Sequence, residues 1–190
     1  ACGECSGGMH GANRLGGNGV ANSTVFGGIA GEQMAQFAAG ESLRDADQCA
    51  VDHAVAQALR PFGSKGGDLN SLRERLQNLM WDKVGIARNE AELNEAMAEL
   101  DDLSAELEAT GLGDQGRVFN LTWHDWLNLD RQIEISKTIA HAALAREDSR
   151  GAHFREDSPE TAGLMESRYT VVSSVNEQMQ VNTRPVDFAI

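Results

Sequence analysis

Residues 69–107 have the sequence LNSLRERLQNLMWDKVGIARNEAELNEAMAELDDLSAEL, in which apolar residues recur three and four positions apart. They form two runs, the first with Leu69, Leu72, Leu76, Leu79, Met80 and Val84, the second with Leu93, Met97, Leu100, Leu103 and Leu107. A third run, at residues 121–146, contains Trp126, Leu129, Ile133, Ala140 and Ala143. Such spacings place the side chains of each run on one helical face. We therefore predict three amphipathic helices.

The segments between these runs are short and polar, at residues 87–89 and 111–116. Short connectors favour antiparallel neighbouring helices. The predicted fold is therefore mainly α, with a three-helix bundle that is spectrin-repeat-like. We interpret the apolar stripes as the core of this bundle and not as a cofactor-binding face.

The chain upstream of the bundle is rich in glycine. Residues 1–17 are expected to form the end of a strand and a loop, and residues 18–39 a helix with one face of small residues. A second apolar pattern predicts a helix at 41–59, which ends before Pro61.

The chain downstream of the bundle begins with a polar, irregular segment. Near the C-terminus, residues 168–172 and 179–183 alternate in polarity or are β-branched, which predicts two strands, as in a hairpin. The predicted organisation is a strand–loop–helix stub at 1–45, a helical domain at 46–150 and an irregular tail with short strands at 151–190.

Composition excludes some classes of partner. The chain has 190 residues, of which 41% are hydrophobic and 24% charged, and its formal net charge is −13. An acidic surface argues against nucleic acid and anionic membranes as partners. There is no apolar run long enough to span a bilayer, so we expect no direct membrane insertion.

The three cysteines are Cys2, Cys5 and Cys49. A small and odd number of cysteines argues against a disulfide framework. Cys2 and Cys5 form a C-x-x-C pair, which could be redox-active or half of a zinc site. No second C-x-x-C is present, so the sequence favours two incidental cysteines beside a glycine loop, and we expect no metal site.

Residues 3–18, GECSGGMHGANRLGGN, join a glycine cluster to the predicted helix start. Backbone N–H groups at a glycine-rich helix start can approach an electron-rich ligand, because no Cβ is in the way and the helix dipole is positive there. Arg14 adds a planar, two-pronged donor that suits a carboxylate or phosphate. This segment is therefore a candidate loop for binding an anion or a cofactor.

Two further blocks follow in the chain, LQNLMWDKVGIARNEAELNEAMAEL at residues 76–100 and ALAREDSRGAHFREDSP at residues 143–159. Together and in this order, the three blocks resemble the succinate dehydrogenase/fumarate reductase flavoprotein family. The resemblance covers about residues 1–160 and includes the last flavin-binding segment and the helical C-terminal domain.

The resemblance implies an FAD-dependent oxidoreductase that interconverts a C4-type dicarboxylate and its unsaturated form by hydride transfer at flavin N5. Glu4 aligns with a residue that accepts hydrogen bonds from the ribityl chain. Gly19 and Val20 align with amides that face the pyrimidine end of the flavin, and Arg14 with an arginine that binds a substrate carboxylate. We interpret His10 as structural, and residues 150–157 as a packing and charge-network segment.

The chain contains no G-x-G-x-x-G after a strand with an acidic residue some twenty positions later. We therefore expect it to be part of a longer flavoprotein, to hold no catalytic residue itself, and to be inactive and free of FAD when isolated. The resemblance implies as partners the upstream dinucleotide-binding and capping domains and an iron–sulfur subunit. It also implies a cytoplasmic location, peripheral to the inner face of a membrane through partner subunits.

Two other hypotheses remain open at this point. The chain could be a non-catalytic helical interaction fragment, or a subunit of a split flavoprotein that completes its site on a partner. A zinc or redox module on Cys2 and Cys5 is a third, weaker hypothesis. Residues 19–22, GVAN, depart from the serine and aliphatic pair that usually follow in membrane-complex members of the family. This departure leaves the substrate and the electron partner open.

Overall fold

The computed structural model describes residues 1–8, 10–12, 16–176 and 178–187. The chain separates into two compact units, Ala1–Asp47 and Gln48–Ile190. No helix among the described residues is both long enough and apolar enough to cross a membrane.

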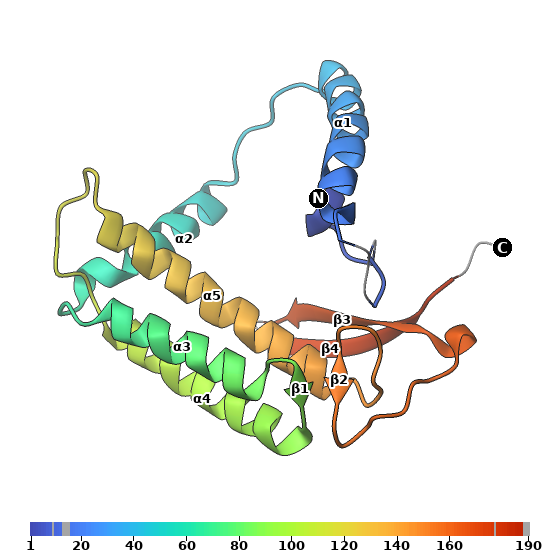
Figure 1. The fold of residues 1–190 in the computed structure, drawn as a ribbon. Helices are drawn as coiled ribbons and strands as arrows, with labels where there is room; N and C mark the ends of the chain where they lie inside the picture. Colours follow the sequence, from blue (N-terminus) through green and yellow to red (C-terminus); the bar gives the residue numbers. More distant parts are fainter. Residues whose placement is uncertain (9, 13–15, 177, 188–190) are drawn as a thin grey trace. The chain divides into compact units, whose positions relative to one another are not determined.

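The first unit contains one turn of 3-10 helix, η1 (Gly3–Cys5), and the long helix α1 (Asn18–Ala39) (Figure 1). The bounds of α1 are those predicted. The strand end expected in residues 1–17 is wrong, because the described part of this segment contains η1 and turns. A strand needs a neighbouring strand to satisfy its backbone groups, and the described residues of this unit contain none.

The second unit begins with α2 (Gln48–Leu59), followed by the 3-10 turn η2 (Arg60–Gly63). The predicted helix at 41–59 is therefore wrong in its first third, since residues 41–47 are not helical. No residue of α2 is buried, so there is no burial of apolar surface that would stabilise additional helical turns before Gln48. Ser42, Asp45 and Asp47 also have side chains that compete for the backbone hydrogen bonds of a helix.

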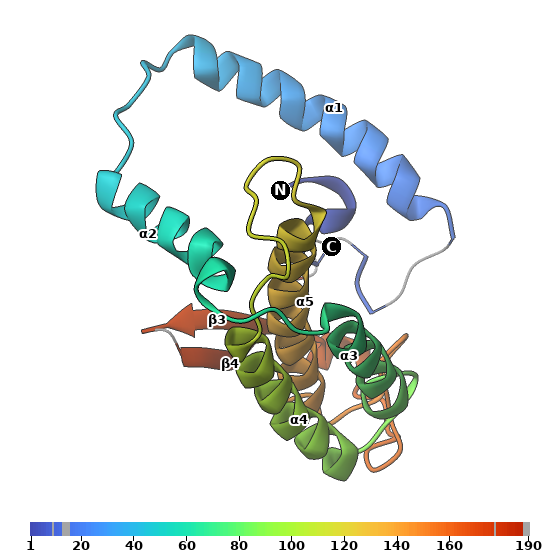
Figure 2. The ribbon, with the colours of Figure 1, turned by 90° about the vertical axis from the view of Figure 1, so that its left-hand side faces the viewer.

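Three helices form the predicted bundle: α3 (Leu69–Lys83), α4 (Glu90–Ala109) and α5 (Leu121–Leu144). They lie side by side, and each runs antiparallel to the one before it (Figures 1 and 2). Each starts at a capping side chain that accepts a backbone N–H of the first turn. Asp68 accepts from Asn70 and Ser71, Asn89 from Glu92, and Asn120 from Trp123. Such caps define where each helix begins.

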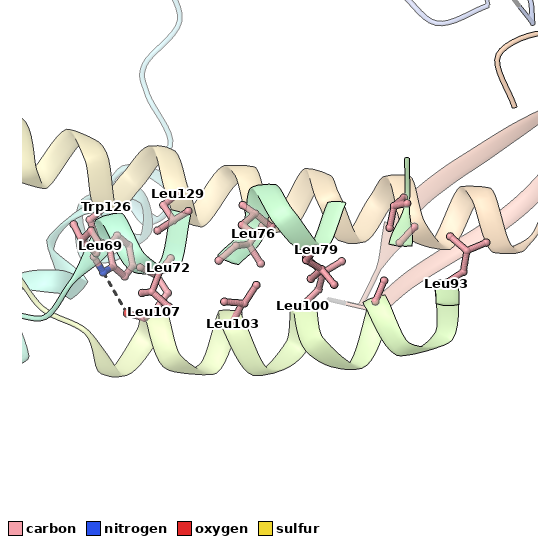
Figure 3. Close-up of a cluster of buried hydrophobic side chains, with 14 of the residues drawn as sticks. Leu69, Leu72, Leu76, Leu79, Leu93, Leu100, Leu103, Leu107, Trp126 and Leu129 are labelled. Carbon is pink, nitrogen blue, oxygen red and sulfur yellow. Dashed lines mark hydrogen bonds between the residues drawn. The ribbon is translucent and has the colours of Figure 1, made fainter. Parts of the chain in front are cut away.

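The core of the bundle consists of the predicted stripes with Ala96 and Leu112 in addition, except that Met80 and Met97 are only partly buried against it (Figure 3). Its buried members are Leu69, Leu72, Leu76, Leu79, Val84, Leu93, Ala96, Leu100, Leu103, Leu107, Leu112, Trp126, Leu129, Ile133, Ala140 and Ala143. Trp126 is completely buried, and its Nε1 donates to the carbonyl of Thr110 at 2.7 Å. The prediction that these stripes are core is confirmed.

A close backbone crossing connects the segment before α3 to the segment before α5. Gly66 and Gly111 form a parallel bridge, and the N–H of Gly111 donates to the carbonyl of Lys65 at 2.8 Å. A Cβ on Gly111 would lie 2.0 Å from the carbonyl oxygen of Ser64. Only glycine fits at this crossing.

Four short strands complete the second unit. β1 (Ala87–Arg88) lies between α3 and α4 and pairs in parallel with β2 (Phe154–Arg155), which follows α5. After the 3-10 turn η3 (Leu164–Glu166), the strands β3 (Arg168–Val175) and β4 (Gln178–Pro185) form an antiparallel hairpin. The predicted C-terminal pair of strands is confirmed.

Candidate functional site

The residues predicted to contact a flavin lie in the first unit. Glu4 is the middle residue of η1, and Gly19 and Val20 belong to the first turn of α1. Gly19 is buried, whereas Val20 is 74% exposed. Arg14, the predicted carboxylate ligand, lies outside the described residues, as does the side chain of Glu4.

η1 packs directly on the second turn of α1. Gly3 has a positive φ of 70°, and a Cβ at this position would lie 2.8 Å from the Cα of Ser23. A side chain at residue 3 would therefore push the turn off the helix. On the facing side, the hydroxyl of Ser23 donates to the carbonyl of Gly19 at 2.8 Å. Glycine at position 3 thus brings the backbone of Glu4 close to the start of α1.

Among the described residues, no side chain caps the start of α1. Its N-cap is Gly17, in the left-handed conformation with φ 87°, and its first turn contains no acidic residue. The first N–H groups of a helix have no partner within the helix and carry the positive end of its dipole. Gly17 offers no side chain to satisfy them. This end of α1 therefore suits an electron-rich ligand, such as the pyrimidine edge of a flavin.

His10 links the glycine loop to α1. Its Nδ1 lies 3.5 Å from the side-chain nitrogen of Asn22, and its Nε2 is buried without a partner among the described groups. This contact is consistent with the structural role that we predicted for His10. Asn22 is a contact that the sequence analysis did not identify.

The third motif, in the second unit, surrounds the end of α5. Arg155 is 2% exposed, and its Nη1 donates to the carbonyls of Ala143, Leu144 and Arg146 at 3.1 to 3.3 Å. The last carbonyls of a helix have no partner within it and carry negative partial charge. Arg155 therefore caps α5 with a buried cation.

Asp157 connects this cap to another helix. Its two oxygens accept from Nε and Nη2 of Arg155 at 2.7 and 2.8 Å, and Oδ2 also accepts the N–H of Glu90 at 2.7 Å. Glu90 is the first residue of α4. The forked hydrogen bonds from Arg155 hold the pKa of Asp157 well below its usual range. The pair therefore joins the end of α5 to the start of α4.

His153 extends the network to β1. Its Nδ1 lies 2.8 Å from Nη1 of Arg88 and its Nε2 lies 3.3 Å from the carbonyl of Arg146. Because arginine can only donate, Nδ1 is the acceptor, and the ring is neutral with its proton on Nε2. Burial, and then the nearby charges of Arg88, Arg146 and Arg155, lower the pKa of His153.

In this geometry residues 150–157 form a packing and charge network, as the sequence predicted. Arg155 and Asp157 form hydrogen bonds with backbone groups at helix ends, and His153 forms hydrogen bonds with Arg88 and Arg146. Sequence reasoning missed Arg88, whose Nε also donates to the carbonyls of Val84 and Gly85 at the end of α3. Its position in a three-residue connector gave no signal of this role.

The described residues contain no group of three or more potential metal ligands. In the C-x-x-C pair, Cys2 is half-buried, Cys5 is exposed and neither forms a disulfide. Cys5 Sγ donates to the carbonyl of Cys2 at 3.1 Å.

Residues 73–190 match the family described as fumarate reductase flavoprotein C-term. Among curated relatives, an uncharacterized FAD-dependent oxidoreductase of Methanocaldococcus jannaschii is 39% identical over 163 residues, covering 85% of this chain and 29% of that protein. The fumarate reductase flavoprotein subunit of Escherichia coli is 33% identical over 163 residues, covering 83% of this chain and 27% of that protein.

A solved structure, Mycobacterium smegmatis Sdh1 in complex with UQ1, is 36% identical with a TM-score of 0.90 and covers 100% of this chain and 33% of that chain. The chain thus spans about 30% of the length of the proteins that it matches.

Proposed function

The chain belongs to the fumarate reductase flavoprotein C-terminal family, and from this premise we propose that it is the C-terminal part of an FAD-dependent oxidoreductase. The proposed reaction interconverts a C4-type dicarboxylate and its unsaturated form. The observation that carries the proposal is the 36% identity with Sdh1 over the whole chain, at a TM-score of 0.90. This similarity includes both the glycine-rich unit and the helical unit.

In this proposal the first unit supplies one side of the flavin site. FAD, when bound, supplies a hydride donor and acceptor at its N5 atom. The backbone amides of Gly19 and Val20 stabilise negative charge at the pyrimidine end of the ring, because they lie in an uncapped first helical turn. Glu4 accepts hydrogen bonds from the ribityl hydroxyls. The backbone of Glu4 lies in η1, which can pack closely on α1 because residue 3 is glycine.

Arg14 is proposed to bind one carboxylate of the substrate. A guanidinium and a carboxylate form two parallel charge-assisted hydrogen bonds, which fix the orientation of the substrate as well as its position. Such fixed orientation lowers the barrier to hydride transfer, because it removes motions that a free substrate would have to lose. The catalytic residues themselves are proposed to lie in the part of the protein outside this chain.

The surface of α1 supports the proposal that further protein packs on this unit. Large apolar side chains on α1 are exposed, at 56% for Val25, 52% for Ile29, 61% for Met34 and 67% for Phe37. Glu32 is the one charged residue of this 22-residue helix. A helix that is apolar on several sides is normally buried. We propose that the upstream dinucleotide-binding and capping domains cover it, and that an iron–sulfur subunit is the electron partner.

The experiment that tests this function uses the complete protein, with its upstream part. Its absorption spectrum should show one bound FAD, and it should reduce fumarate with a reduced dye or oxidise succinate with an oxidised one. A complete, folded protein that binds FAD but acts on neither dicarboxylate would contradict the proposed substrate class.

The second hypothesis concerns the chain in isolation. Its sequence contains no dinucleotide fingerprint, so nothing predicted here would hold the pyrophosphate and adenosine of FAD. We propose that the isolated chain is inactive and does not bind FAD tightly. Flavin fluorescence during a titration measures this directly, and sub-micromolar binding would show that the chain carries a cofactor site of its own.

A further inference from the structure

The loop between α4 and α5 (Figure 1) meets α5 in three large apolar residues, Val118, Phe119 and Leu121. Phe119 is 98% exposed, and the other two are largely exposed as well. Single exposed apolar residues are common on protein surfaces, but a cluster of them indicates a surface that another part of a protein covers. We call these three residues the apolar tip.

The backbone of Phe119 is strained. Its φ is 55°, in the left-handed region that bulky residues rarely adopt. At 98% exposure its ring gains almost nothing from packing on the described residues, so packing does not offset the strain there. Strain of this kind clusters at sites that bind a ligand or a partner, where an added contact offsets its cost.

Asn120 holds the loop in this conformation. Its side chain is buried, and its Nδ2 donates to the carbonyls of Asp114 and Gly116 at 2.8 and 2.7 Å. Its Oδ1 accepts the N–H of Trp123, in the first turn of α5, at 2.9 Å. Phe119 directly precedes this residue in the chain. The apolar tip is therefore preorganised, and a partner would order little of it on binding.

The same loop packs on η2, the segment through which the chain enters the bundle. The guanidinium of Arg117 lies 5.3 Å from the centre of the Phe62 ring, and the N–H of Leu112 donates to the carbonyl of Pro61 at 3.2 Å. The apolar tip thus belongs to the end of the bundle where the chain arrives from upstream. The chain spans only about 30% of the length of the proteins that it matches.

We propose that the apolar tip docks on the upstream part of the complete protein, with Phe119 inserted into an apolar pocket there. Aromatic side chains are enriched in the cores of interfaces, because each buries a large apolar area. Burial of the ring then offsets the cost of its backbone conformation. The inference rests on the proposed place of the chain in a longer flavoprotein, but not on the reaction that this protein catalyses.

The test compares Phe119→Gly in the 190-residue chain and in the complete flavoprotein without partner subunits. Glycine adopts a positive φ without strain, so the melting temperature of the chain should rise or stay constant. In the complete protein it should fall by several degrees, because the pocket loses its ring. Hydrogen exchange of the unaltered proteins is a second measurement. The amides of residues 117–119 should exchange more slowly in the complete protein than in the chain.

Two further variants make the test specific. Asn176→Gly is the matched backbone control, because Asn176 also has a positive φ, of 51°, but a polar side chain. It should shift the melting temperatures of both proteins alike. Phe119→Leu keeps part of the apolar volume and should lower the melting temperature of the complete protein less than Phe119→Gly does.

Equal shifts for Phe119→Gly in the two proteins, or equal exchange at residues 117–119, would overturn the proposal. Dimerisation of the chain through the apolar tip, or protection that arises only when a partner subunit binds, would overturn it too. Both measurements are independent of turnover. A complete protein that acts on neither dicarboxylate would therefore contradict the proposed function and leave this inference standing.

Discussion

Arg155 and Asp157 are two positions apart in the chain, and together they join the end of α5 to the start of α4. Arg155 donates two hydrogen bonds to the carboxylate of Asp157, at 2.7 and 2.8 Å, and its remaining nitrogen donates to three carbonyls at the end of α5. Asp157 also accepts the first N–H of α4. A segment downstream of the bundle therefore stabilises the bundle itself.

Arg155→Ala should lower the free energy of unfolding of the helical unit by about 2–4 kcal/mol, because it removes a buried cation and its hydrogen bonds from the carboxylate of Asp157 and from three carbonyls at the end of α5. Urea denaturation followed by circular dichroism measures the change. The matched control is Arg75→Ala, which breaks an ion pair to Glu106 whose two side chains are half exposed. That change should cost no more than about 0.5 kcal/mol. Equal effects from the two variants would show that Arg155 is only a surface contact.

The pair of Arg155 and Asp157 also predicts that the stability of the helical unit falls at acidic pH. The pKa of Asp157 is well below its usual range because Arg155 donates to its charged form. Its contribution to stability is therefore complete above the unfolded pKa of about 4 and is lost as the pH falls through the lower pKa of the folded state. Asp157→Asn should be less stable than the unaltered chain at pH 7, and the difference should shrink as the pH falls below about 4. A difference that is constant down to pH 2 would contradict this account.

His153 should change the stability of the fold in a different, higher pH range. Burial and three neighbouring arginines lower its pKa from 6.5, so the unfolded chain binds a proton more readily than the folded chain does. Stability should therefore fall as the pH decreases through about 6.5 towards the folded pKa. His153→Gln cannot gain this proton, and its stability should change less between pH 7 and pH 5. Denaturation curves at several pH values measure both slopes, and identical slopes would exclude His153 as the source.

Gly111→Ala tests the close crossing before α5. The new methyl group would lie 2.0 Å from the carbonyl oxygen of Ser64, so the backbone has to move, at a cost of about 1–3 kcal/mol or more. Gly113→Ala is the matched control two positions away, because its methyl group would meet no atom within 4 Å. The melting temperature should fall for Gly111→Ala and stay nearly constant for Gly113→Ala. An unchanged melting temperature for Gly111→Ala would mean that the crossing is looser than described.

The sequence predicted the bundle well because its information is local. Leucine spacing within each helix is enough to place Leu72, Leu100 and Leu129 in the core, where the structure also has them. The caps Asp68 and Asn89 act on N–H groups two or three positions away, but the sequence analysis did not identify them.

Features that depend on distant parts of the chain were not predicted. The pairing of β1 with β2 joins segments more than sixty residues apart, and each strand has two residues, too few for a pattern. Arg88 acquires its role only through His153 in that pairing. The helix expected from residue 41 begins at Gln48, because the side chains of Ser42, Asp45 and Asp47 compete for the backbone hydrogen bonds of a helix.

The candidate flavin site could be predicted only through the family resemblance. A glycine-rich loop and an uncapped helix start favour an electron-rich ligand, but they do not distinguish a flavin from a phosphate. The roles of Glu4, Gly19 and Val20 therefore stay predictions, and so does that of Arg14.

The most direct test of the proposed function is the specificity constant of Arg14→Ala in the complete flavoprotein. Loss of an arginine partner of a buried carboxylate costs about 2–5 kcal/mol, so kcat/KM for the dicarboxylate should fall roughly 30-fold or more. Arg14→Lys should recover only part of this loss, because an ammonium cannot form the forked contact. Both variants should keep their FAD and their melting temperature. If Arg14→Ala instead loses FAD or unfolds, while turnover per folded site is unchanged, Arg14 holds the loop and does not bind the substrate.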